Sequence, residues 1–226
     1  MSIQNIIDKA QQLEIDRRRM ISQTISRSQR VKTAERNTTQ PWKFKITPPG
    51  SLDWASSRGF MEVIDLNDRV NEYTISLNNN PGMNYITAYQ GGLRQSQLDA
   101  LTISSTGTST LVLTGLPNIG TTTTNTTTFV SSLTVILAQG DYIQPANSRY
   151  PYTVTADVLR GSNTTTSVTL NRSLLTSEGV NLIGQHVNIG NACTWRVIVT
   201  GMPTYTLIPM RRVQYTGDFE LIEKVI

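Results

Sequence analysis

Short alternating segments, separated by turn residues, fill the stretch from residue 137 to residue 199. The runs 150–158, 166–174 and 194–199 mostly alternate apolar and polar residues, and glycine, asparagine or proline residues lie between them. A two-residue period is typical of a strand that buries one face. Several such strands at close spacing indicate a small barrel or sandwich, so the sequence predicts a mainly β protein with a β-barrel or sandwich body.

The amino-acid composition favours the same fold class. Of the 226 residues, 38% are hydrophobic and 16% are charged, and threonine, serine and asparagine take up much of the remainder. Both fractions are low for a globular chain, and this mixture suits strands joined by long polar loops. The one cysteine, Cys193, cannot form a disulfide within the chain, and we predict that it is a small packing residue.

Strand and turn signals divide the chain into three predicted parts. The apolar end at 219–226 is expected to return beside the strand predicted at 42–46, which would make the segment between them partly an insertion. The predicted parts are an N-terminal helical and basic arm (1–40), a main β-sheet body (41–90 and 205–226), and an inserted β-rich domain (91–204) with a threonine-rich loop (117–128).

Several local elements follow from the same alternation. Strands are predicted at 72–77 and 83–89, and a hairpin is predicted from 102 to 113 around Thr106-Gly107. A last pair of strands is predicted at 205–208 and 213–220. Most of these segments end at glycine, asparagine or proline residues, which commonly form turns.

Residues 2–30 form the only long segment with helical periodicity. Apolar residues recur there at steps of three and four, and Ser2 can cap the start. The sequence offers no second long helix to cover this apolar stripe. Its partner is therefore either the β body or another subunit.

The N-terminal arm also carries the charge imbalance of the chain. Residues 1–40 hold eight basic and four acidic side chains, whereas the other 186 residues hold twelve of each. Arginines in a polar segment suit bidentate pairs with carboxylates of an adjacent subunit; contact with nucleic-acid phosphates and plain solvation are the alternatives. The residues predicted to contact a second subunit are Ile3, Ile6, Ile7, Ala10, Leu13, Arg17, Arg18, Arg19, Arg27, Arg30 and Arg36.

Residues that commonly carry catalysis are sparse in this sequence. His186 is the only histidine, which excludes a metal site with two histidines, and it lies at a polar position of a predicted strand. The densest carboxylates are Glu62, Asp65, Asp68 and Glu72, and the arginines near them favour ion pairs over a glycosidase pair. We therefore predict no enzymatic activity, no cofactor and no metal.

Two further features bear on location and on an alternative function. No run approaches the ~20 apolar residues of a membrane span, and the first ten residues are amphipathic, so we expect synthesis in a cytoplasm without membrane insertion. Aromatic residues could form a platform for a sugar, although ordinary strand and turn positions are the favoured interpretation. These aromatic residues are Trp54, Tyr89, Tyr150 and Tyr152.

Two stretches of the sequence resemble tail proteins of tailed bacteriophages. The segment 58–77, with Asp68-Arg69 between apolar pairs, is similar to the early sheet of tube-type and distal-tail proteins. The other resemblance is carried by Gly140-Asp141-x-Ile143-Gln144, Tyr152-x-Val154-Thr155-x-Asp157-Val158, Val168-x-Leu170 with Leu174 and Leu175, and Gly184-x-x-Val187-x-Ile189-Gly190.

The resemblance implies a structural virion protein without catalytic residues or cofactors. Such proteins form β-barrels that pack as homo-oligomeric rings, commonly hexamers, around the channel through which DNA passes as transient cargo. Their arms often clasp neighbouring subunits, and other tail proteins are further partners. The expected location is the virion tail, as a tail tube or a ring in the baseplate region, after synthesis in the host cytoplasm. A receptor- or carbohydrate-binding β-module of a tail or fibre is the alternative.

Overall fold

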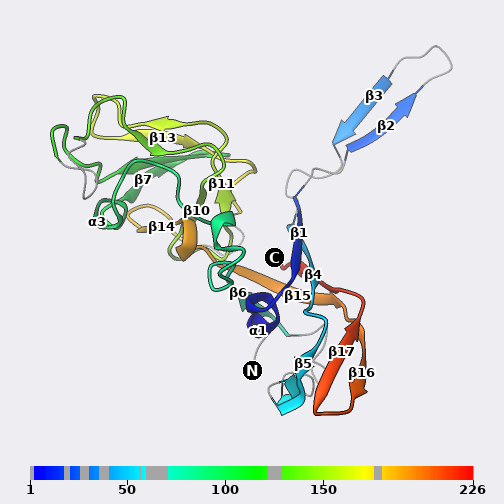
Figure 1. Cartoon of the computed structure of the whole chain (residues 1–226). Helices are drawn as coiled ribbons and strands as arrows, with labels where there is room; N and C mark the ends of the chain where they lie inside the picture. The colour runs from blue at the N-terminus through cyan, green and yellow to red at the C-terminus, as the bar shows by residue number, and fades with distance from the viewer. Residues whose placement is uncertain are drawn as a thin grey trace. The chain divides into compact units, whose positions relative to one another are not determined.

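The computed structural model describes residues 3–17, 21–25, 31–35, 41–55, 57–59, 71–121, 129–175 and 180–225. The protein is mainly β, as the sequence predicts, and its sheets are antiparallel (Figure 1). In the ranges given, no sheet closes into a barrel. The short helical segments with bounds inside the described ranges include α1 (Gln4–Asp8), η1 (Asn84–Ile86), α3 (Gln95–Leu98) and η2 (Gly190–Ala192). None of these described helices has the length and apolar character needed to cross a membrane.

The chain folds into two compact units. Unit 1 comprises Met1–Tyr73 and Arg196–Val225, and unit 2 comprises essentially the residues between them, from Thr74 to Trp195. The chain passes between the units twice, within β6 (Tyr73–Ile75) and at the start of β15 (Trp195–Gly201). The sequence had placed the corresponding borders after residues 90 and 204.

A five-stranded sheet forms the centre of unit 1, in the order β1-β4-β18-β15-β6. Its first three strands are β1 (Gln12–Asp16), β4 (Lys43–Thr47) and β18 (Phe219–Glu223). The register places Phe219 opposite Ile46 and Leu221 opposite Phe44, so the predicted return of the C-terminal segment beside the strand at 42–46 is confirmed. All four of these side chains are at most 1% exposed, because alternation turns them to the same buried face.

The predicted helix over residues 2–30 is wrong. The spacing of Ile3, Ile6 and Ile7 does form α1, but this helix ends at Asp8 and β1 begins at Gln12. Further along, β2 (Ile21–Ile25) pairs in antiparallel fashion with β3 (Val31–Glu35). From Leu13 to Asp16 apolar and charged residues alternate with a period of two. Pairing with the distant strand β4 stabilises this extended form, and local helical spacing carries no sign of that pairing.

A second, smaller sheet in unit 1 has the order β16-β17-β5. Strand β16 (Thr204–Ile208) pairs with β17 (Arg212–Thr216), which pairs in turn with β5 (Leu52–Asp53). The two strands predicted at 205–208 and 213–220 are thereby confirmed as a hairpin, with one difference. The second strand stops at Thr216, and β18 begins only after Gly217, whose φ of +105° suits glycine.

The described residues of unit 2 form three small antiparallel sheets, in the orders β13-β8-β7, β11-β10-β14 and β12-β9. The predicted hairpin at 102–113 is confirmed, and its turn is closed by the Gly107 N–H donating to the Thr110 carbonyl at 2.9 Å. The strands are β7 (Thr102–Thr106), β8 (Thr110–Thr114), β9 (Val135–Leu137), β10 (Tyr142–Pro145), β11 (Tyr152–Thr153), β12 (Val158–Leu159), β13 (Thr166–Thr169) and β14 (Val187–Ile189).

The strand predicted at 83–89 is wrong, because this segment contains η1. The N–H groups of Met83 and Asn84 both donate to the Asn80 carbonyl at 2.9 Å. Asn80 also accepts the Gly82 N–H through its side chain at 2.9 Å. These local bonds close a turn over Pro81-Gly82 and use the backbone groups that a strand would offer to a neighbour.

Buried charged side chains organise the loops of unit 2. Arg160 is 7% exposed and donates to the carbonyls of Pro117, Gly161 and Asn163. The carboxylate of Asp141, 3% exposed, accepts the backbone N–H groups of Gln90 and Ala138. Burial raises the pKa of Asp141, although these N–H donors partly oppose the rise. These two buried charged groups thus bond to backbone groups of the same unit.

Candidate interaction surfaces

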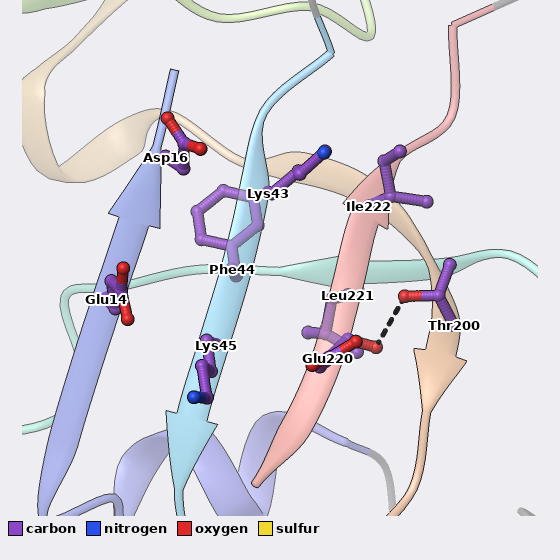
Figure 2. Close-up of a pocket in the computed structure, with 9 residues that line it drawn as sticks. All are labelled: Glu14, Asp16, Lys43, Phe44, Lys45, Thr200, Glu220, Leu221 and Ile222. Carbon is purple, nitrogen blue, oxygen red and sulfur yellow. Dashed lines mark hydrogen bonds between the residues drawn. The ribbon is translucent and has the colours of Figure 1, made fainter. Parts of the chain in front are cut away.

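The outer face of the five-stranded sheet forms a charged groove with a volume of about 440 Å³. Figure 2 shows two carboxylates on β1, two lysines on β4 and one carboxylate on β18. The register places Glu14 opposite Lys45, Lys45 opposite Glu220, and Asp16 opposite Lys43. Because the apolar residues of the same strands face the core, alternation alone brings these charges together in rows.

The groove is lined mainly by paired charges of opposite sign. Cross-strand pairs of opposite charge are worth about 0.2–1 kcal/mol each, so they stabilise the sheet modestly. Three carboxylates face two lysines, which leaves a local excess of negative charge. Lys45 also lies 3.3 Å from Asp218, whose pKa is lowered chiefly by a hydrogen bond from Thr47. Nowhere among the described residues do three His, Cys, Asp or Glu side chains gather as a metal site would require.

The apolar part of the predicted subunit contact is covered by the chain itself. Ile3, Ile6, Ile7 and Ala10 are between 0% and 9% exposed. Leu13 is half-buried in β1, opposite Ile46. Ile3, Ile6, Ile7 and Ala10 therefore lie in the core rather than on a surface open to a second subunit, whereas the contact predicted for the half-buried Leu13 stays a prediction.

The arginines of the predicted contact are only partly described. The Arg17 guanidinium lies 5.5 Å from the centre of the Trp42 ring, a cation–π contact within the chain. Arg18, Arg19, Arg27, Arg30 and Arg36 lie outside the described residues. The prediction that these five meet a neighbouring subunit stays a prediction.

The residues weighed as catalytic candidates have structural contacts. His186 is half-buried in an isolated bridge with Thr102, and its carbonyl accepts the Ala146 N–H at 2.9 Å. Glu72 forms ion pairs with Arg196 at 3.2 Å and Lys224 at 3.3 Å, two partners that are distant in the sequence. Burial alone would raise the pKa of Glu72, but these two cations outweigh it and lower the pKa. Glu62, Asp65 and Asp68 lie outside the described residues.

The four aromatic residues do not form an open platform. Tyr150 and Tyr152 are 1% and 0% exposed, so their ring faces are not available to a sugar. The Tyr89 hydroxyl donates to the Ile136 carbonyl at 2.5 Å, and burial raises the pKa of Tyr89 to about 12. Trp54 belongs to unit 1, whereas the three tyrosines belong to unit 2.

Cys193 is a packing residue, as predicted from its sequence context. Its side chain is 1% exposed and its Sγ lies 3.5 Å from the Asn188 carbonyl. Burial raises the pKa of the thiol far above its ordinary value, which disfavours the reactive thiolate.

The ribbon formed by β2 and β3 is an insertion between two neighbouring strands. Asp16, the last residue of β1, lies opposite Lys43, the first residue of β4, so the intervening segment leaves the sheet and returns to the same place. Among the described strands, β2 and β3 pair only with each other. Residues 17–36 carry seven basic and one acidic side chain, and Ile25 at the end of β2 is 73% exposed.

Strand β16 is a second open edge, which the sequence analysis did not single out. All five of its residues are exposed, and Leu207 is 58% exposed. Met210 in the following turn is 92% exposed. The signal in the sequence is a strand without any charge, followed by Pro-Met-Arg where a hairpin turn usually has glycine or asparagine.

Neither sequence families nor characterised relatives add to this description. No protein-family model matches the chain, and no curated protein sequence matches it either. The function is therefore inferred from the open surfaces of unit 1, together with the resemblance carried by residues 58–77 and 140–190.

Proposed function

We propose that this chain is a structural subunit of a bacteriophage tail, which assembles with copies of itself into a ring or tube around the DNA channel. The resemblance of residues 58–77 and 140–190 to tail proteins supports this proposal. The observation that carries it is the basic β2–β3 ribbon, inserted between β1 and β4.

A two-stranded ribbon of this kind needs a partner. Isolated hairpins are marginally stable in water, and both outer edges of this one carry backbone groups that pair with no further described strand. The seven basic side chains of residues 17–36 repel one another unless negative charge lies close to them. A neighbouring subunit can supply both missing strands and carboxylates.

The partner favoured by the charges is another copy of this chain. The groove on unit 1 offers an excess of carboxylate through Glu14, Asp16 and Glu220. Arginine binds carboxylates with two parallel hydrogen bonds, which fixes orientation as well as adding attraction. A ribbon of one copy seated on the groove of the next is a head-to-tail contact, the type that closes into rings.

The test replaces residues 19–40 with a four-residue glycine–serine turn. The fold of unit 1 is expected to persist, because β1 and β4 are already adjacent at Asp16 and Lys43 and a short turn suffices to join them. We expect the variant to lose the ring- or tube-sized species in sedimentation velocity and to be missing from particles, whereas the unaltered chain assembles.

A matched control replaces the same residues with a glycine–serine linker of equal length. This control retains the reach of the segment but loses both the ribbon and its charge. Assembly by either variant to the same mass as the unaltered chain would overturn the role of the ribbon. Purified tail particles that lack this chain would overturn the tail assignment.

A further inference from the structure

Strand β16 has one edge that pairs with no other described strand. It pairs on one side with β17, and the order β16-β17-β5 places it at the end of the sheet (Figure 1). The residues Thr204–Ile208 are all exposed. The outer N–H and C=O groups of an edge strand are a ready template for another strand.

The side chains of β16 do nothing to block such pairing. Proteins usually protect an exposed edge with lysine, proline, a bulge or a very short strand, and none of these occurs between Thr204 and Ile208. Tyr205 and Leu207 share one face and are 42% and 58% exposed. The Tyr205 ring continues this face onto Tyr215, with ring centres 6.3 Å apart.

The turn after β16 adds an independent observation. Met210 and Arg211 have φ values of +69° and +61°, in the left-handed region that favours glycine. They are the only non-glycine residues among those described that have positive φ. Tight hairpin turns often need positive φ at successive residues, and this turn places the 92% exposed side chain of Met210 directly after β16 in the sequence.

We propose that β16 pairs with β16 of a second copy, antiparallel and about a two-fold axis at Thr206. This alignment places Tyr205 opposite Leu207 of the second copy, and Thr204 opposite Ile208. Two tyrosines and two leucines then share one face, and no charge lies opposite another. The edge strand β1 is a poor candidate for such self-pairing, because it carries Glu14 and Asp16 and would bring carboxylates together.

This contact goes beyond the proposed function and does not depend on it. A two-fold contact joins copies in pairs, whereas ring closure needs a head-to-tail contact. Dimers through β16 are expected even if the ribbon binds nothing. The two results are therefore separable in the same full-length protein.

The first test is Leu207→Lys in the full-length chain, measured by sedimentation equilibrium. A charge in the apolar cluster should raise the dimer dissociation constant at least tenfold. Leu133→Lys is the control, because Leu133 is 75% exposed in unit 2 and lies outside the described strands. Equal dimerisation by both variants would overturn the proposal.

The second test reads the register directly and does not depend on the first variant. Residues opposite each other in paired strands have Cβ atoms about 4.5–5.5 Å apart, close enough for a disulfide after slight adjustment. Thr206→Cys should therefore form a covalent dimer under mild oxidation. Thr204→Cys should not, because residue 204 of one copy lies opposite residue 208 of the other, four positions along the strand from the second cysteine. The native Cys193 is buried and does not compete. Equal cross-linking of both variants, or none of either, would overturn the two-fold register.

Discussion

The two units of the molecule use charge and backbone freedom in opposite ways. Unit 2 has only four basic and four acidic residues, and buried groups such as Arg160 and Asp141 bond to its own backbone. Every described residue of unit 2 with positive φ is a glycine. Unit 1 holds the other charges of the chain, the charged groove, the β2–β3 ribbon, the exposed edge strand β16 and the turn with two non-glycine residues at positive φ. The surfaces that we propose bind other copies thus lie in unit 1, whereas the two buried charged groups of unit 2 bond to the backbone of that unit.

The largest effect is expected when a buried charged side chain of unit 2 is replaced by an uncharged one. Arg160→Met removes the donor for three carbonyls, and we expect the free energy of unfolding to fall by about 2–3 kcal/mol, because these buried acceptors lose their partner. Chemical denaturation measures this change. Arg94→Met, at an exposed arginine of the same unit, serves as the control. A loss no greater than that of the control would mean that Arg160 is not part of the scaffold.

An intermediate effect of opposite sign is expected at the turn of unit 1. Met210→Asn combined with Arg211→Gly should raise the free energy of unfolding by about 1 kcal/mol, because these residues tolerate positive φ. The thermal midpoint should rise accordingly. Met210→Leu retains both the apolar side chain and the strained backbone, so it should change little. If the double variant gains nothing over Met210→Leu, the turn holds no strain.

The smallest effect concerns pH and the ion pairs of unit 1. The folded-state pKa of Glu72 is lowered, so its stabilising contribution is present above its ordinary pKa of about 4.5 and is lost as the pH falls below that value. Glu72→Gln should therefore cost about 0.5 kcal/mol at neutral pH and nothing at strongly acidic pH. Denaturation midpoints of both proteins over the acid range measure this difference. A difference between the two midpoints that does not change with pH would mean that packing, and not charge, causes the effect.

Part of the fold could be predicted from alternation, and the failures have physical reasons. The hairpin at 102–113 has its partner strand close in sequence, and the C-terminal return relies on a long apolar end; both predictions hold. The N-terminal error arises because Ala10 and Leu13 fit helical spacing, while β1 depends on a partner about 30 residues further along the chain. Local spacing carries no information about such a distant pairing.

The interaction surfaces were harder to predict than the fold. Alternation in Tyr205-Thr-Leu-Ile208 predicts a strand, but it does not show whether a second strand or a core covers it. For Ile3, Ile6 and Ile7 the reverse holds: an apolar stripe without a visible partner in the sequence is buried by the chain itself. Burial is a property of the whole fold, so sequence periodicity identifies candidate faces and leaves their coverage open.

The mass of the purified full-length chain in solution tests the central claim most directly. Sedimentation over a range of concentrations should show species larger than a monomer, and replacement of the ribbon at 19–40 should remove the head-to-tail assembly while leaving a dimer through β16. A protein that sediments as a monomer at every concentration, with or without the ribbon, would contradict the claim that the open edges of unit 1 exist to bind other copies.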